Sequence, residues 1–252
     1  AGTSNTAALA FGGTANPPVY ALTELWNGTG WTEVGDLTLA RAAMGAAGSS
    51  TAAIAFGGTG TGDSETWNGS SWTEITAMST ARSSMGPSMA GTTTAVLGAG
   101  GANGGIKNIT ERWNGSSWSE LSDLNTTRYS MGGAGTITSA LVFGGYTPGG
   151  QTAATEKWNG ASWTSVNDLT TARYNFNGSG VSGTSALAFG GQPGVGDATA
   201  KTELWTGSSW AEQNDRNTAV VGPASAGTAS SALGFGGEGP PALAVTEAWN
   251  AP

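Results

Sequence analysis

The sequence predicts an all-β fold built from one short unit that is repeated along the chain. Six apolar runs end in a Gly doublet, at intervals of 43 to 46 residues, from Phe11-Gly12-Gly13 to Phe235-Gly236-Gly237. Around them, runs of four to eight residues alternate in character and are bounded by Gly, Asn, Asp or Pro, which is typical of strands. The 252 residues include 43 Gly but also 11 Trp and 6 Phe, so the chain carries enough large apolar surface to fold.

Each repeat predicts four strands, which we name a to d. In the first copy, strand b covers residues 6–11, strand c residues 22–26 and strand d residues 31–34, and strand a of the next copy covers residues 41–47. A period of about 45 residues with four strands per unit is the signature of a β-propeller, whose blades are four-stranded antiparallel sheets.

The repeat boundaries predict one domain over residues 1–252, with six blades favoured over five. Five full repeats cover residues 1–47, 48–89, 90–134, 135–179 and 180–225, and a partial sixth covers 226–252. Six blades use every b–c hairpin but leave the first without an inner strand and the last without an outer one. Five blades would close if the strand at residues 220–225 completed the blade begun at Thr6, with residues 232–249 left as a surplus hairpin.

The repeated residues resemble a known family. An Arg that opens strand a, an aromatic residue and Gly-Gly that close strand b, Glu-x-aromatic on strand c and Trp on strand d resemble the kelch repeat of kelch-type β-propellers, over essentially the whole chain. The c–d turn is shorter than usual for the family, and strand c carries Trp in place of Tyr. This low-charge version is similar to kelch-like repeats of phage tail-associated and bacterial surface proteins, which implies an extracellular or virion-associated location.

Trp pairs flank the predicted turn between strands c and d. Asn-Gly is a strong hairpin signal, and the spacing Trp-Asn-Gly-x-x-Trp places the two rings opposite each other on one face. We expect these rings to pack between blades; they would serve as sugar-stacking platforms only if some were exposed. The pairs are Trp26/Trp31, Trp67/Trp72, Trp113/Trp118, Trp158/Trp163 and Trp205/Trp210.

The same register predicts facing carboxylates on strands c and d. Glu24 faces Glu33, Glu65 faces Glu74, Glu111 faces Glu120 and Glu203 faces Glu212, whereas Glu156 faces Ser165. Like charges directly opposite each other repel, so solvation, sheet twist, a nearby cation from Arg or Lys, a shared proton or a bound hard cation must relieve them. A solvated or Arg-compensated arrangement is favoured, and no metal site is predicted.

Four Arg residues recur at the start of strand a. For them we expect a structural role, in bonds to backbone carbonyls or to the strand-c Glu; a ring at one mouth of the channel that receives an anion is the alternative. They are Arg41, Arg82, Arg128 and Arg173, and the fifth equivalent is Val220.

The b–c loops differ most between repeats. Variable loops on one rim of a rigid scaffold are where recognition normally occurs. They cover residues 14–20, 59–63, 102–107, 146–151, 192–200 and 238–242. The candidate ligand-binding residues on them are Tyr20, Asn103, Lys107, Tyr146, Gln151, Gln192 and Asp197.

Composition excludes several classes of function. The chain has no Cys and no His, which removes thiolate and imidazole catalysis and zinc sites built on these ligands. A net charge of −8 argues against nucleic acid as a partner, and no apolar run is long enough to suggest membrane insertion.

We therefore expect a non-catalytic binding or structural module, with no cofactor, that recognises a glycan or a surface protein through its b–c loops. One alternative is assembly, in which unpaired terminal strands join subunits by β-addition. The other is a glycan-active enzyme that depends on two convergent carboxylates in the channel.

Overall fold

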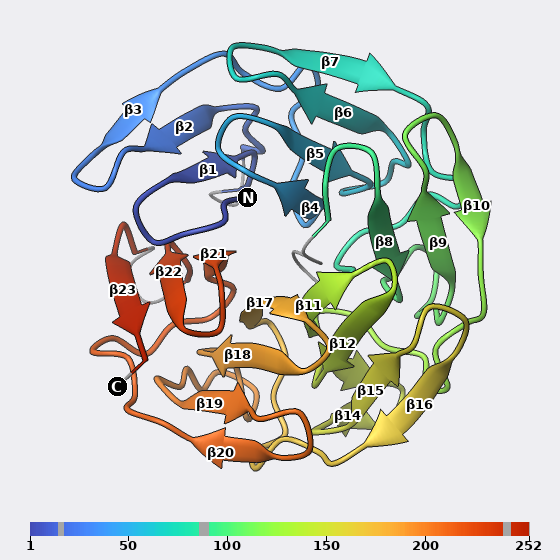
Figure 1. Ribbon diagram of the computed structural model, residues 1–252, viewed down its shortest axis with the longest axis vertical. Helices are drawn as coiled ribbons and strands as arrows, with labels where there is room; N and C mark the ends of the chain where they lie inside the picture. The colour runs from blue at the N-terminus through green and yellow to red at the C-terminus, as the bar shows by residue number, and fades with distance from the viewer. Residues whose placement is uncertain (15–17, 86–90, 239–242, 252) are drawn as a thin grey trace.

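The computed structural model describes residues 1–14, 18–85, 91–238 and 243–251, and these contain strands and no helix. The strands form six antiparallel sheets of three or four strands, which follow one another in chain order around a common centre (Figure 1). This arrangement is compatible with a β-propeller.

The first three sheets come from residues 8–120. The first contains β1 (Ala8–Phe11), β2 (Thr23–Trp26) and β3 (Trp31–Glu33). The second contains β4 (Gly45–Gly48), β5 (Ala53–Phe56), β6 (Ser64–Trp67) and β7 (Trp72–Ile75). The third contains β8 (Val96–Ala99), β9 (Thr110–Trp113) and β10 (Trp118–Glu120).

The other three sheets come from residues 132–250. The fourth contains β11 (Gly132–Thr136), β12 (Ser139–Phe143), β15 (Thr155–Trp158) and β16 (Trp163–Val166), with the small hairpin of β13 (Tyr146–Thr147) and β14 (Gly150–Gln151) in its b–c loop. The fifth contains β17 (Asn177–Ser182), β18 (Ser185–Phe189), β19 (Thr202–Trp205) and β20 (Trp210–Glu212). The sixth contains β21 (Ala224–Gly227), β22 (Ser231–Phe235) and β23 (Thr246–Asn250).

The first and last sheets contact each other directly. The Gly227 amide donates to the Gly2 carbonyl at 2.9 Å, and the Asn5 side chain donates to the Asn250 side chain at 3.0 Å. The rings of Trp31 and Phe235 lie 4.8 Å apart. Segments from the two ends of the chain therefore lie side by side, blue against red in Figure 1.

Two details differ from the predicted strands. The Arg residues do not open a strand. An irregular segment separates Arg41 from β4, because Ala43 adopts a positive φ of 55° that interrupts the extended backbone. The strand after Val220 pairs with β22 and not with β1, so the pairing that the five-blade alternative requires is absent among the described residues.

The core lies between consecutive sheets. Strand b supplies its central layer, because Leu9, Ile54, Leu141 and Leu187 are fully buried. Small residues on strand a allow consecutive sheets to approach closely: a Cβ added to Gly178 of β17 would lie 2.5 Å from the ring of Phe143 in the preceding sheet. The Gly-rich composition is therefore a packing requirement of closely stacked sheets.

Candidate functional site

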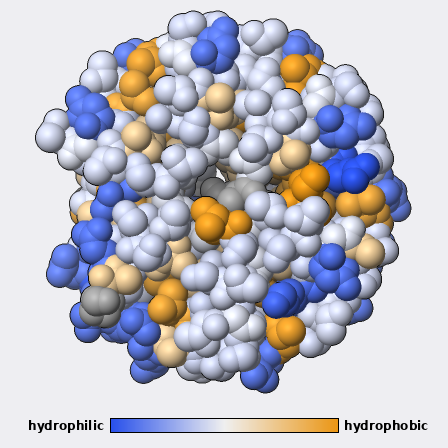
Figure 2. Space-filling view, viewed as in Figure 1, coloured by the Kyte–Doolittle hydropathy of each residue, from blue (hydrophilic) through white to orange (hydrophobic). Residues whose placement is uncertain are grey.

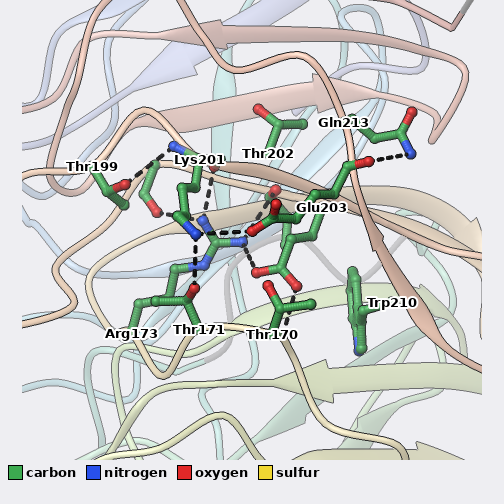
Figure 3. Close-up of polar contacts among 12 residues, drawn as sticks. Thr170, Thr171, Arg173, Thr199, Lys201, Thr202, Glu203, Trp210 and Gln213 are labelled. Atoms are coloured by element: carbon green, nitrogen blue, oxygen red, sulfur yellow. Dashed lines mark hydrogen bonds and ion pairs between the residues drawn. The ribbon is translucent and has the colours of Figure 1, made fainter.

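A buried ion pair lies in each of four sheets. Arg41 Nη2 lies 2.9 Å from Glu65 Oε1, and Arg173 Nη2 lies 2.9 Å from Glu203 Oε1 (Figure 3). Burial lowers the pKa of Arg173, and the charge of Glu203 opposes this shift. The other two pairs are Arg82–Glu111 and Arg128–Glu156.

These pairs are tied into the backbone. Arg128 also donates to the carbonyls of Gly144 and Ala154, and Glu156 accepts from the Asn125 and Thr126 amides. The predicted structural role of the four Arg residues is thus confirmed. The alternative of an anion-binding ring is wrong, because these side chains are fully buried and already paired.

The predicted facing carboxylates are confirmed in register: Glu65 pairs with Glu74, and Glu156 with Ser165. In both pairs the strand-c carboxylate is buried against its Arg, whereas Glu74 is exposed to solvent. Glu24 differs, because it is exposed and has no ion pair within the described part of the chain. The repulsion is therefore relieved by Arg and by water.

The Trp pairs face each other as predicted, with ring centroids 5.3–5.7 Å apart. Eight of these ten rings are buried in the spaces between sheets, so they cannot act as sugar-stacking platforms. Only Trp26 and Trp31, in the first sheet, are half-buried.

A chain of backbone hydrogen bonds runs from sheet to sheet at the rim that carries the b–c loops. The amide of Ser84 donates to the carbonyl of Ala43, Ser130 to Ser84, Asn175 to Ser130 and Gly222 to Asn175, at 2.6–2.9 Å. Each donor and acceptor has a φ between 48° and 60°. This shared left-handed conformation holds the residues beside it in fixed positions on the rim.

Three Tyr side chains gather on this rim. The ring of Tyr146 lies 5.6 Å from that of Tyr129 and 5.0 Å from that of Tyr174. Tyr129 and Tyr174 directly precede two of the residues with positive φ, Ser130 and Asn175, which fix their direction. All three rings are half-buried, and no described residue forms a hydrogen bond with their hydroxyl groups. Burial raises the pKa of Tyr129, with a smaller contribution from Tyr146.

Amide side chains border these rings. Gln151 donates to the carbonyl of Pro193 at 2.9 Å, and Asn175 donates to the side-chain oxygen of Gln192 at 3.1 Å. The first bond joins the b–c loops of the fourth and fifth sheets, and the second connects the b–c loop of the fifth sheet to the segment before β17. We call the group of Tyr129, Tyr146, Tyr174 and these amides the tyrosine site. It offers aromatic faces, neutral donors and acceptors, and no carboxylate.

The structure brings together three of the predicted binding residues, Tyr146, Gln151 and Gln192. The others are not part of this group: Tyr20 is exposed on another part of the rim, Asp197 is exposed in the loop that carries Gln192, and Asn103 donates to the Ala81 carbonyl. The carbonyl of Lys107 accepts from the Arg128 amide, so the loop of the third sheet borders the tyrosine site. Loop residues 15–17 and 239–242 lie outside the described residues.

Sequence reasoning missed Tyr129 and Tyr174. A signal existed, because both directly follow the repeated Arg, where the second and third sheets carry Ala42 and Ser83. A Tyr at the same place in two successive repeats predicts neighbours on the rim, one sheet apart.

The centre of the molecule is hollowed (Figure 2). A cavity of about 60 Å³ there is lined by small residues such as Gly48, Gly91, Ser179 and Ala226. The described lining contains no carboxylate. No cluster of three potential metal ligands occurs among the described residues, and they include no helix with the length and apolarity that crossing a membrane requires.

No protein-family model matches this chain, and the search of curated proteins found no match.

Proposed function

We propose that this protein is a non-catalytic kelch-like propeller of six blades that binds an uncharged, hydroxyl-rich ligand, such as a glycan, at the tyrosine site. The resemblance of the repeats and the direct contact between the first and last sheets support the propeller. The resemblance alone supports a place on a virion, as a tail or receptor-binding component, or on a cell surface.

The observation that carries the proposal is the contact between Tyr146 and the rings of Tyr129 and Tyr174. Aromatic faces bury the apolar C–H surface of a sugar ring, and the hydroxyl and amide groups around them exchange hydrogen bonds with its hydroxyls. The same groups suit a loop on a surface protein less well, because none of the residues that make up the tyrosine site carries a charge. A catalytic alternative lacks support, since the described lining of the central cavity has no pair of carboxylates.

The test is a screen of the intact chain on an array of immobilised oligosaccharides, followed by calorimetric titration of the best ligand. We expect Tyr146→Ala to weaken binding by about tenfold or more, because a central aromatic contact is lost. Tyr20→Ala, which removes an exposed Tyr elsewhere on the rim, should leave the affinity unchanged. Equal losses from both variants, or no array signal above background, would refute the proposal.

A further inference from the structure

A Trp from strand d enters five of the six interfaces between sheets that follow one another around the centre. At four of these interfaces the indole donates to the hydroxyl of the first strand-c residue of the neighbouring sheet, and at four its ring contacts the Phe that ends strand b there. The ring centres of Trp72 and Phe11 lie 4.7 Å apart, and Trp72 Nε1 donates to Thr23 Oγ1 at 3.0 Å. The ring centres of Trp210 and Phe143 also lie 4.7 Å apart, and Trp210 Nε1 donates to Thr155 Oγ1 at 3.0 Å. Trp31, Trp118 and Trp163 occupy the same place at the other three interfaces.

The interface between the fifth and sixth sheets has the receiving residues but no such Trp among the described residues. Phe189 and Thr202 correspond to Phe143 and Thr155, and both line a cavity of about 90 Å³ beside Trp249 of β23. Thr202 is buried, and its Oγ1 forms no hydrogen bond within the described part of the chain. The cavity therefore presents an aromatic wall and a hydrogen-bond acceptor in the arrangement that holds an indole elsewhere.

Arg216 makes this cavity different from the other interfaces. Arg216 comes directly after Asp215, just as Leu169 comes directly after the equivalent Asp168. It therefore occupies the position of a buried Leu that packs against the strand-d Trp. Its side chain is only 7% exposed, lies 3.5 Å from Glu247 and places its guanidinium carbon 5.8 Å from the ring centre of Phe189. Its Nε and Nη1 have no partner among the described residues. A buried guanidinium that already contacts one ring is suited to receive a second aromatic face.

The strand beside this cavity has a free edge. In the first sheet, the Thr23 carbonyl and the Asn27 amide bond to strand d. The corresponding residues of β23 are Thr246 and Asn250, and because strands alternate with a period of two, the backbone of Ala248 faces the same free edge. No described strand pairs with this edge of β23.

The residue that follows β23 differs from the residues that begin the other c–d turns. Five Gly residues with φ near 97° follow the Asn or Thr of those turns, at Gly28, Gly69, Gly115, Gly160 and Gly207. Ala251 stands in that position, and its amide continues along β22 by donating to the Ser230 carbonyl at 2.9 Å. An L-residue disfavours the left-handed conformation that the tight turn needs. A strand that adds at this edge is therefore not expected to join β23 through the tight turn that the other five sheets use.

We propose that this edge and cavity bind an extended segment of another polypeptide that carries a Trp. The segment adds antiparallel to β23, with its Trp opposite Trp249. The indole enters between Phe189 and Arg216 and donates its N–H to Thr202 Oγ1. This site lies at a different interface from the tyrosine site, so the two binding activities are independent.

The probe is a fluorescein-labelled peptide with the sequence of residues 162–167, Ser-Trp-Thr-Ser-Val-Asn, titrated with the whole chain and followed by fluorescence anisotropy. This segment is chosen because its second Ser would lie opposite Glu247, where Glu would add repulsion. We expect saturable binding that weakens by about tenfold or more when Ala replaces the Trp of the peptide. Equal binding of both peptides, or none at millimolar concentration, would overturn the proposal.

Two protein variants locate the contact. Thr202→Val removes the acceptor for the indole and should weaken binding about fivefold, and Ala248→Pro removes the edge amide and should abolish it. Thr32→Val, on an exposed outer strand of the first sheet, is the matched control and should bind like the parent protein. Circular dichroism confirms folding of each variant. A parent-like affinity in Thr202→Val would exclude this cavity even if Ala248→Pro failed to fold.

Discussion

At the scale of single residues, the buried ion pairs are the most demanding feature of this protein. Their members carry full charges in an interior of Ala, Leu and Trp. They are tolerated because each Arg also donates to backbone carbonyls and each Glu also accepts from backbone amides. The buried ion pairs thus connect strand c of each of these repeats to the segment that precedes strand a.

Removing one member of a pair should be costly. We expect Arg128→Met to lower the free energy of unfolding by about 3–5 kcal/mol, because Glu156 is left buried without its cation. Lys201→Met breaks the exposed pair with Glu212 and should cost less than about 1 kcal/mol. Urea unfolding of both variants measures the difference, and similar losses would contradict this account.

One missing hydroxyl contact can be restored. Trp118 Nε1 is buried and has no partner in the described part of the chain, and Ser64 occupies the position where Thr accepts from the corresponding Trp at other interfaces. Ser64→Thr should raise the free energy of unfolding by about 1 kcal/mol, since the other interfaces accommodate the extra methyl group. Thr110→Val, which removes such an acceptor from Trp163, should lower it by about 1–3 kcal/mol. Calorimetric melting compares the two, and destabilisation by Ser64→Thr would show that the second sheet has no room.

At the scale of elements, the c–d hairpin follows from local chemistry. Asn-Gly or Thr-Gly places Gly where φ is near 97°. The Asn side chain accepts from the backbone amides two and three residues later, as Asn68 does from Ser70 and Ser71. The hairpin then aligns the Trp pair and the facing Glu residues. All of this could be predicted from the sequence, because it depends on neighbours within about ten residues.

The turn glycines should resist substitution. Gly69→Ala forces an L-residue to a φ of 97° and should cost about 1 kcal/mol or more. Gly149, exposed in the β13–β14 turn and without a positive φ in the left-handed region, is the control, and Gly149→Ala should change stability by less than about 0.5 kcal/mol. Denaturant midpoints of the two variants test this, and the reverse order would argue against a positive φ at Gly69.

At the scale of the whole molecule, the meeting of the first and last sheets joins the two ends of the chain. The amino group of Ala1 lies in this region and donates to the Leu9 carbonyl at 2.7 Å. Burial lowers its pKa from 8.0 to about 5. The folded protein therefore keeps an uncharged amine at a pH where the unfolded chain carries a charged one.

This difference predicts a pH dependence of stability for the 252-residue chain. Between about pH 5 and pH 8 the unfolded state binds the extra proton, so stability should fall as the pH is lowered through this window and change no further from this group below it. Melting temperatures measured across the window should show the trend, and acetylation of the amino group should flatten it. An acetylated chain with the same slope would assign the dependence to other groups.

Turn chemistry and the strand period of two act over short distances, so the sequence alone specifies the repeat, the hairpins, the Trp register and the pattern of facing carboxylates. The contacts between side chains of different strands and sheets depend on the tertiary structure. Glu65 forms a buried ion pair with Arg41, whereas Glu24 is exposed to solvent. Tyr129 and Tyr174 both contact Tyr146, and Arg216 lines a cavity together with Phe189. These contacts join residues from different strands or sheets, and the stacking of sheets around a common centre, rather than any local pattern, brings them together.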